Sequence, residues 1–572
     1  MAATLGCWTA LSVLLVGLGL LVPVGFTERG WDADRAFATF WLGWLVAISV
    51  LQAWSLAAPV APWALPFLAG LAVLGLWRGG TGLAVTLVRS AGRRPRTAAA
   101  IALLVVWLSD RALGPPVGDS GLYHLSVIRW LARYGTVPGL ANVVGQFGFH
   151  QPSLLWSAAL EVGPLWGRSS HLAMSVLVAA IGARGVLGLG RIFRPRAARP
   201  VDVFAALLLP VVVGQAVTLH ELRLSGPDTD TAAALTGLAA ATELVAALTG
   251  PRDWPAWPHR LTAMLLAALS ALLKPSMGVF GIGLVLIAGW TGRSEGDRSS
   301  RRRALALWLG LALPLAVLWL ARGVRLSGYP FYPWGFFPAA VDWRLPELER
   351  QGVLRDIIGS LPPVVDQLRV GGEGWVRPWL VWQVTRIPEL ALLPAAVMVV
   401  GLTFLRRAPP GPARRALWVL VAGLPAGAVW LASAPHPRLV YGVLWACAAA
   451  TGTAVGGGDL AQAGNRRRGL FLALLLALPA FPALHRVAAW SWRGEPERAV
   501  EALLLGAGAD HGFHPTPRME TAPCVTAFGL SLVVPVGDGK IWDAPLPAAT
   551  HCDPRLAARR PGHLEQGFRL EQ

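Results

Sequence analysis

The sequence is poor in charge and almost free of lysine. Only 14% of its 572 residues are charged, whereas soluble globular proteins carry about a quarter, and the mean hydropathy is +0.52. Lysine occurs only at Lys274 and Lys540, so arginine supplies nearly all of the basic charge behind the net +18. The low charge excludes an ordinary soluble domain. In a membrane protein, arginine in the loops usually sets the orientation of the helices, so we expect no nucleic-acid partner.

Cysteine is scarce as well, and common catalytic motifs are lacking. The cysteines are Cys7, Cys447, Cys524 and Cys552, with no CxxC and no metal-ligand spacing. No P-loop, GxGxxG, GxSxG or HExxH motif stands in a supporting context, so soluble-type nucleotide chemistry is not indicated. Cys7 and Cys447 lie in apolar runs and are expected to be inert. Cys524 and Cys552 both lie in the C-terminal tail, where we expect a structural disulfide in an oxidising compartment.

Long apolar runs are abundant. Residues 7–26, 201–219 and 304–320 are each long enough to cross a bilayer core of about 30 Å. The first run lacks a basic leader and a clear cleavage site, so it is predicted to be a membrane anchor and not a removed signal peptide. The composition therefore predicts an all-α polytopic membrane protein.

The arginine-rich loops give this protein a predicted topology. Five segments carry three to five arginines each and belong on the cytoplasmic side: 78–96, 191–199, 293–303, 406–415 and 466–468. Placing them there gives about 14 spans: 7–26, 37–57, 62–77, 97–110, 170–190, 201–219, 231–250, 261–273, 276–292, 304–322, 388–405, 416–433, 438–456 and 469–486. The LLKPS stretch between two of these spans is either a turn or a break within a kinked pair.

The same scheme divides the chain into six parts. They are N-terminal transmembrane helices (1–110), a first large extracytoplasmic loop with an interfacial helix (111–169), a transmembrane core (170–322), an extracytoplasmic aromatic loop (323–387), further transmembrane helices (388–487) and an extracytoplasmic tail (488–572). The tail has strand-like runs broken by GDG and proline, which predict a small C-terminal α/β cap.

The densest polar cluster lies in the first large loop, PVGDSGLYHLSVIRWLARYGTVPGLANVVGQFGFHQ (116–151). Apolar residues recur on one side of SGLYHLSVIRWLARYG, which predicts a short helix ending at Gly135. The helix is too short and too polar to span, so we expect it to lie on the outer leaflet with Asp119 at its start. A plain amphipathic anchor is the alternative.

Three short outer turns carry one cation each: Arg223, Lys274 and Arg438. Such a charge needs a partner or a function at a membrane boundary, although it can also simply reach the headgroups. The acids predicted on the same face are Asp119, Glu161, Glu221, Asp228, Asp230 and Asp342. Carboxylates can bind a divalent metal or act as a general base, and the cations could hold a phosphate. Asp228 is equally suited to cap the helix that follows it.

The long outer loop contains a second unusual segment, SGYPFYPWGFFPAAVDWRLP. Aromatic residues interleaved with proline are typical of a membrane interface, and they would also suit a platform for sugars or a lipid chain. Tyr332 is a candidate contact there, and Asp342 lies at the polar edge.

The motif DSGLYHLSVIRWLARYGTVPGLANV resembles an uncharacterised family of large bacterial membrane proteins that share D-x-G-L-Y-H followed by Y-G-x-V-P-G-L-x-N. YPFYPWGFFPAAVDWRLP, APHPRLVYG and IWDAPLPAATHCDP fit the same family. That family in turn resembles the GT-C superfamily of polytopic glycosyltransferases, which use polyprenyl-phosphate-linked sugars. In many of those enzymes an acid in the first large outer loop is essential, and here the matching residue is Asp119. The chain departs from their paired-acid motif, because Ser120 follows Asp119.

The resemblance implies a GT-C-like fold and an inverting sugar transfer on the outer face of the bacterial cytoplasmic membrane. Asp119 would be the catalytic base, or the ligand of a divalent cation (Mg²⁺ or Mn²⁺) if one is used. The implied substrate-binding residues are Tyr123, His124, Asn142, His150, Asp228, Asp230, Lys274, Tyr332, Asp342 and Arg438. The lipid bilayer and a polyprenyl-phosphate sugar donor would be the partners. Two alternatives remain open: a transporter or flippase of lipid-linked glycans, and a non-catalytic envelope assembly protein.

Overall fold

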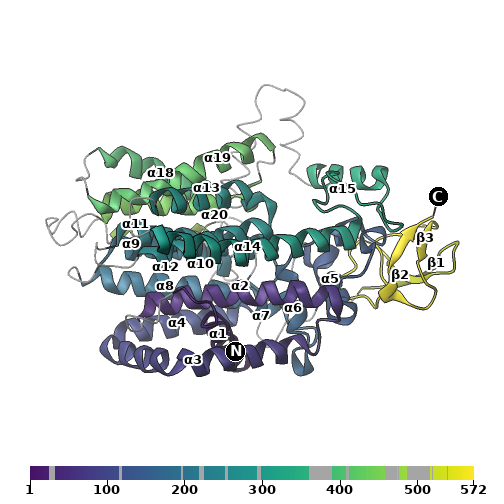
Figure 1. Cartoon of the computed structure of the whole chain (residues 1–572), viewed down its shortest axis with the longest axis horizontal. Coiled ribbons are helices and arrows are strands. Elements are labelled where there is room, and N and C mark those ends of the chain that lie inside the picture. The colour runs from purple at the N-terminus through teal and green to yellow at the C-terminus, as the bar shows by residue number, and fades with distance from the viewer. Residues whose placement is uncertain are drawn as a thin grey trace.

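The computed structural model describes residues 1–24, 32–114, 119–194, 198–217, 224–250, 256–292, 298–359, 390–406, 411–433, 436–457, 473–474, 476–485, 488, 516–517, 519–537 and 539–571. Long helices run side by side along the long axis of the molecule, and small β-sheets lie at one end (Figure 1). The mostly helical architecture predicted from composition is therefore confirmed.

Helices long and apolar enough to cross a membrane number eight among the described residues. They are Ala2–Gly19, Ala33–Ala57, Ser170–Ile192, Pro200–Val217, Thr229–Thr249, Ala256–Leu273, Ala304–Ser327 and Pro412–Ser433. Four shorter apolar helices are Ala64–Gly80, Pro275–Thr291, Leu392–Leu405 and Leu476–His485. The predicted spans 97–110 and 438–456 are the helices α4 (Pro95–Arg111) and α20 (Tyr441–Gly456). The total of 14 spans stays a prediction, and part of 469–486 lies outside the described residues.

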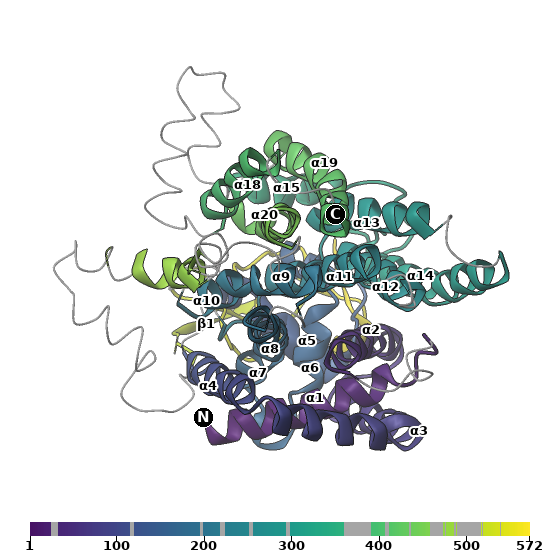
Figure 2. The same cartoon turned by 90° about the vertical axis from the view of Figure 1, so that its left-hand side faces the viewer.

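The elements of the bundle are bounded as follows: α1 Ala2–Gly19, α2 Ala33–Ala57, α3 Ala64–Arg93, α8 Ser175–Ile192, α9 Pro200–Ala206, α10 Leu209–Val217, α11 Thr229–Thr249, α12 Ala256–Leu273, α13 Gly278–Thr291, α14 Arg298–Ser327, α18 Leu392–Leu405 and α19 Trp418–Ser433. Viewed along the long axis, α9, α11 and α12 form a middle layer between α18–α20 and the N-terminal helices (Figure 2). The predicted span 201–219 is two helices, because the chain turns at Leu207 and Leu208.

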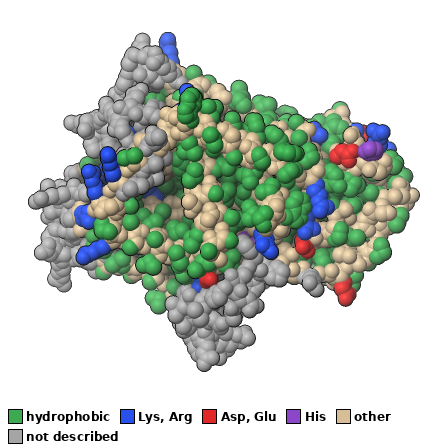
Figure 3. Space-filling view, turned by 90° about the horizontal axis from the view of Figure 1, so that it is seen from below, with side chains coloured by type: hydrophobic (Ala, Val, Ile, Leu, Met, Phe, Trp, Pro, Cys, Tyr) green, Lys and Arg blue, Asp and Glu red, His purple; other side chains and the backbone are tan. Residues whose placement is uncertain are grey.

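Burial explains this layering. Nearly every residue of α11 is buried, and many of them are alanine, so neighbouring helices approach it closely. The outer helices α13, α14, α18 and α19 instead expose large apolar side chains such as Ile282, Leu313 and Val421. Apolar side chains cover the middle of the face shown in Figure 3, with most charged side chains toward its two ends. This distribution fits a belt facing lipid.

The two ends of the bundle differ. At the end opposite the sheets, Asp34 at the start of α2 meets Arg191 at the end of α8 and Arg199 just before α9; we call this the arginine-rich end. At the other end of α2, the Ser55 carbonyl accepts a hydrogen bond from the Thr136 N–H in the first large loop (2.7 Å). We call this second end, which carries the sheets, the capped end.

The LLKPS stretch is a turn between two helices. α12 ends at Leu273, Lys274 is extended, and α13 begins at Gly278 after a 3-10 turn, Pro275–Met277. A Cβ at Gly281 would lie 2.6 Å from the carbonyl oxygen of Ala267, so the two helices pack tightly as a hairpin. Of the two alternatives for this stretch, the turn is correct.

The first large loop contains the predicted short helix, but its surroundings differ from expectation. A π-helical turn (η2, Ser120–His124) leads into α5 (Leu125–Tyr134), and Gly135 ends it with φ +72°. Trp130, Leu131 and their neighbours are buried, because α6 (Ser153–Ala159) packs on one side and the C-terminal tail covers another. The prediction of a helix lying on the outer leaflet is therefore wrong.

The C-terminal tail forms two antiparallel hairpins on the capped end. β1 (Thr521–Val525) pairs with β2 (Ser531–Pro535), and β3 (Leu556–Ala558) pairs with β4 (Phe568–Leu570). Among described residues from 519 to 571 the only helical turn is 3-10 (Leu564–Gln566), so this part is β and not α/β. The predicted disulfide between Cys524 and Cys552 is confirmed, with a Cα–Cα distance of 6.0 Å.

Candidate functional site

Four charged side chains from four separate segments meet at the capped end of the bundle. Arg438 lies between two carboxylates: its Nη1 is 3.3 Å from Oδ2 of Asp119, and its Nε is 3.9 Å from Oδ2 of Asp230. Lys274 forms an ion pair with the other carboxylate oxygen of Asp230. The cluster thus joins segments that are up to 319 residues apart in the sequence.

The ends of the helices place these side chains. The Asp228 carboxylate caps α11 by accepting hydrogen bonds from the backbone N–H groups of Asp230 (3.2 Å) and Thr231 (3.0 Å). This cap puts Asp230 in the first turn of α11. Lys274 lies in the extended turn after α12, and Arg438 lies in the short 3-10 turn Pro437–Leu439 just before α20. Asp230, Lys274 and Arg438 therefore each lie at one terminus of a buried helix.

His124 and Tyr123 border this cluster. The His124 side chain is only 2% exposed, and neither ring nitrogen has a hydrogen-bond partner among the described residues. Burial lowers the pKa of His124 to about 4, against the opposing effect of Asp119. The ring of Tyr123 contacts that of His124 at a centroid distance of 4.2 Å, and Gln151 Nε2 donates to the Tyr123 hydroxyl (3.4 Å). The site thus offers a neutral imidazole beside two cations and two carboxylates.

A chain of polar side chains lies behind Asp228. The hydroxyl of Thr231 lies 2.6 Å from Asp228 and 3.2 Å from Gln215, and Gln215 Nε2 donates to the hydroxyl of Tyr441 (2.9 Å). Burial, together with the nearby Asp230, raises the pKa of Asp228 to about 6. Sequence reasoning did not select Gln215 or Tyr441. Tyr441 could have been found, because it lies within the APHPRLVYG motif.

The cluster does not form a ready metal site. No group of three or more His, Cys, Asp or Glu side chains that could hold a metal ion occurs in the part of the chain that the structure describes. Asp119 and Asp230 each face a cation instead of a further oxygen ligand, and Mg²⁺ or Mn²⁺ would need oxygen ligands. The residues present therefore do not fit a divalent cation. They fit an anion better, because Lys274 and Arg438 could both donate hydrogen bonds to phosphate oxygens.

Two further predicted residues lie in polar links within the capped end. The Asn142 amide donates to the backbone oxygens of Gly139 (3.0 Å), Trp343 (2.9 Å) and Phe568 (3.2 Å). Asp342 forms an ion pair with Arg559 (2.8 Å) in the tail. Both side chains join the loops to the tail, and neither lies in the charged cluster.

His150 and Tyr332 are also placed in packing positions. The His150 ring lies against Trp319, with a centroid distance of 3.9 Å, and burial lowers the pKa of His150 to about 3. The Tyr332 hydroxyl donates to the Gly145 carbonyl (2.9 Å). Glu161, another of the predicted acids, accepts hydrogen bonds from Gly167 and Ser169. Arg223 and Glu221 lie outside the described residues.

A second ionic cluster, which sequence reasoning missed, is buried at the arginine-rich end. Asp34 and Asp202 bind the guanidinium groups of Arg184, Arg191 and Arg199, with N–O distances for Arg184 and Arg191 of 2.9–3.1 Å. The cluster was missed because its two acids lie in apolar helices 168 positions apart, where the charge pattern of the loops gives no signal.

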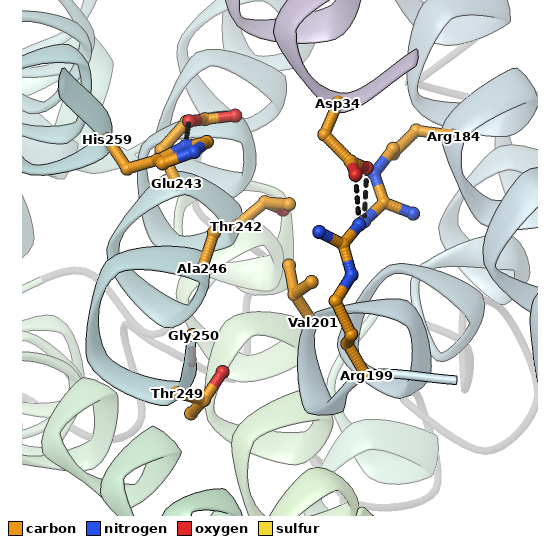
Figure 4. A pocket seen from close by; sticks show the side chains of 10 residues that line it. All are labelled: Asp34, Arg184, Arg199, Val201, Thr242, Glu243, Ala246, Thr249, Gly250 and His259. Carbon is orange, nitrogen blue, oxygen red and sulfur yellow. Dashed lines mark hydrogen bonds and ion pairs between the residues drawn. The ribbon is translucent and has the colours of Figure 1, made fainter. Parts of the chain in front are cut away.

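A small cavity separates this cluster from a second buried pair. Nδ1 of His259 on α12 lies 2.6 Å from a carboxylate oxygen of Glu243 on α11. Figure 4 shows this pair on one side of the cavity and Asp34, Arg184 and Arg199 on the other, with Thr242 between them. About 20 Å³ is open to a water-sized sphere, which is room for about one water molecule. Acidic and basic side chains thus face each other at the arginine-rich end of α11 and α12.

Comparison with known proteins identifies a family for this chain. No curated protein and no solved structure matches the chain. A family model described as a domain of unknown function (DUF8201) matches residues 1–445, which include all four members of the charged cluster and exclude the C-terminal hairpins. The chain therefore belongs to the DUF8201 family.

Proposed function

We propose that this protein is a GT-C-like membrane glycosyltransferase. It transfers a hexose or pentose from a polyprenyl-phosphate-linked donor to a hydroxyl group of an envelope glycan, lipid or protein acceptor. The observation that carries the proposal is the position of Arg438 between Asp119 and Asp230, with Lys274 on the far side of Asp230. A carboxylate that can accept a proton and two cations that can hold a phosphate thus lie within one cluster.

The proposed step is a displacement at the anomeric carbon of the sugar. Asp119 takes the proton from the acceptor hydroxyl while that oxygen forms a bond to the anomeric carbon. The bond between that carbon and the phosphate oxygen breaks, and the polyprenyl phosphate leaves with the electron pair. Lys274 and Arg438 stabilise the negative charge on the departing phosphate. Asp230 holds the two cations in place, and His124 is a neutral hydrogen-bonding group toward the sugar.

The proposed location is the outer face of the bacterial cytoplasmic membrane. Its support is the contrast between the two ends of the bundle, because loops rich in arginine usually stay in the cytoplasm. The charged cluster then faces the extracytoplasmic side. The disulfide between Cys524 and Cys552 agrees with this orientation, because structural disulfides persist in oxidising compartments.

Transport of a lipid-linked glycan is the second candidate, and the Glu243–His259 pair favours it. α11 carries Asp230 near one end and Glu243 near the other, as expected if charges mark a path through the membrane. Between them, however, the only polar side chains of α11 are threonines. Thr231 and Thr242 lie next to the two acids, and the hydroxyl of Thr236 accepts a hydrogen bond from the Trp44 indole (3.1 Å). Transfer at one face therefore fits the described residues better than passage between both faces.

The test is Asp119→Asn in cells that depend on this protein, with Asp342→Asn as the matched control. Both changes remove the charge of one loop aspartate that pairs with an arginine. Envelope glycans and lipid-linked sugars are measured together with the amount of protein in the membrane. We expect Asp119→Asn to lose the glycan product and accumulate the lipid-linked sugar, while the control resembles the wild type. Wild-type glycans in the Asp119→Asn strain, at normal protein levels, would refute the proposal.

A further inference from the structure

The helical turn that follows Asp119 is irregular, and its irregularity frees one carbonyl group. In a regular α-helix the Leu125 N–H would donate to the oxygen of Gly121. Here it donates to the oxygen of Ser120, one residue earlier, and Ser120–His124 is a π-helical turn. Turns of this kind are rare and frequently occur at functional sites. The consequence is that the Gly121 oxygen is open to partners outside the helix.

The C-terminal tail supplies those partners. The backbone N–H groups of Ile541 (2.9 Å) and Trp542 (2.8 Å) both donate to the Gly121 oxygen. The Trp542 indole also lies directly on this glycine, because a Cβ at Gly121 would be 2.6 Å from two of its ring atoms. Only glycine leaves room for this contact. We call residues 541–544 of the tail the strap.

Arginine fixes the strap at a second point, about two helical turns after Gly121. Arg129 Nη1 donates to the backbone oxygens of Asp543 and Ala544 (3.2 Å for the latter), and Nη2 pairs with the Asp543 carboxylate at 3.3 Å. Trp542 itself has φ +35°, a conformation that is uncommon for a residue other than glycine. Such backbone strain persists where the surroundings impose it, often at functional sites.

The tail is built to hold the strap in position. The Cys524–Cys552 disulfide closes a loop with a sequence separation of 28, and the strap lies inside that loop. Within it, the Val533 N–H donates to Pro547 (3.1 Å) and the Ala549 N–H donates to Val533 (3.1 Å), which ties the segment after the strap to β2. Ile541 and Ala544 are buried. The strap is therefore part of a closed unit and not a loose end.

We propose that the strap is a component of the functional site, and that Trp542 and Gly121 are positioning residues for Asp119 and His124. The strap holds the π-helical turn, and the turn directs these two side chains toward Arg438, Lys274 and Asp230. This inference rests on the proposed function for its effect on catalysis. Its structural part stands independently, because the contacts between strap and turn can be measured without any substrate.

The first experiment needs no activity. Amide hydrogen exchange is compared between wild-type protein and Trp542→Ala, with Phe528→Ala as the control, because Phe528 is an exposed aromatic residue of the same tail. We expect amides of residues 120–125 to exchange about tenfold faster in Trp542→Ala, because loss of the indole that packs on Gly121 loosens the strap and lets the turn open more often. Peptides from the arginine-rich end should not change in either variant. Unchanged exchange in residues 120–125 of Trp542→Ala would overturn the inference.

The second experiment is a double-mutant cycle on sugar transfer by the full-length protein. Gly121→Ala should lower kcat about tenfold or more because its new Cβ meets the indole, and Trp542→Ala should lower it through loss of the strap. The kcat of the double variant should be no lower than that of Gly121→Ala alone, and Trp542→Phe should keep most of the wild-type kcat. In all variants KM for the lipid-linked sugar should stay within about twofold of the wild-type value.

The outcomes of the two experiments separate the two proposals. Independent, multiplicative losses in the cycle, or an equal loss in Phe528→Ala, would refute a positioning role for the strap. If no variant and no wild-type preparation transfers sugar, the proposed function fails, while the exchange experiment still decides whether the strap holds the turn.

Discussion

The buried cluster at the arginine-rich end gives the sharpest stability prediction. The Asp202 side chain is completely buried. Its carboxylate pairs with Arg184 at 3.1 Å and Arg191 at 2.9 Å, and it accepts a hydrogen bond from the Arg199 backbone N–H at 3.0 Å. The perturbation is Asp202→Asn, which keeps the shape of the side chain but removes its charge and leaves one hydrogen-bond acceptor where the carboxylate has two.

The expected cost follows from the charges that remain. With both carboxylates present, three guanidinium groups face two negative charges, and in the variant the same three face Asp34 alone. Breaking a buried ion pair by removing one partner costs about 3–5 kcal/mol, because it leaves a buried charge without compensation. An exposed pair is worth about 0–1 kcal/mol. Asp342, with a side chain 44% exposed, is an acid of that second kind.

The assay is equilibrium unfolding of the purified protein in bicelles, with Asp342→Asn as the control. We expect Asp202→Asn to lower the free energy of unfolding by about 3–5 kcal/mol and the control by less than about 1 kcal/mol. Replacing Asp202 and Arg191 together by leucine should cost less than the sum of the two single changes, because the pair is removed as a unit. A loss no larger than that of the control would refute the claim that this cluster stabilises the fold.

Three further predictions follow from the capped end. Burial lowers the pKa of His124 to about 4. Between about pH 6.5 and pH 4 the unfolded chain therefore binds more protons than the folded one, and the free energy of unfolding should fall as the pH falls through this window. His124→Gln should flatten that part of a profile of stability against pH. Replacing Cys524 and Cys552 by serine should lower the stability of the tail by about 3–4 kcal/mol, the loop-closure effect for this separation, and thermal unfolding with and without reductant should show the difference in the wild type alone. Asn142→Ala should lower the free energy of unfolding, because three backbone oxygens lose the amide that hydrogen-bonds to them. In a transfer assay it should leave KM for the lipid-linked sugar unchanged. A selective rise in that KM would instead support contact with substrate.

Much of the helical architecture was predictable from the sequence, because apolar runs of membrane length leave the chain few other structures. The turn at Lys274 and the helix ending at Gly135 were predictable for local reasons: proline and glycine end helices in known ways. The meeting of Asp119, Asp230 and Arg438 was a harder expectation. It depended on placing all the arginine-rich loops on one side, which put the remaining turns together at the other end.

Tertiary contacts decided the features that sequence reasoning missed. Hydrophobic spacing correctly predicted a helix after Asp119, but the spacing cannot tell whether lipid or protein covers its apolar side, and the tail does so here. The Asp34–Asp202 cluster was missed because its two acids lie in different helices, and nothing in the sequence pairs them with the arginines of α8 and of the segment 191–199. Asn142 lies within the family motif, but its amide hydrogen-bonds to backbone oxygens. Every residue has a backbone oxygen, so the sequence alone could not identify these partners.

The strap has a consequence for the order in which this protein is made. Arg129 and Asp543, which meet in the folded protein, are 414 residues apart in the chain. Synthesis runs from the N-terminus and domains fold as they emerge, so the turn after Asp119 is made long before the strap that contacts it. Until then Gly121 has neither of its two donors from the strap. A chain that lacks the strap would therefore carry Asp119 and His124 without the contacts that we propose to position them.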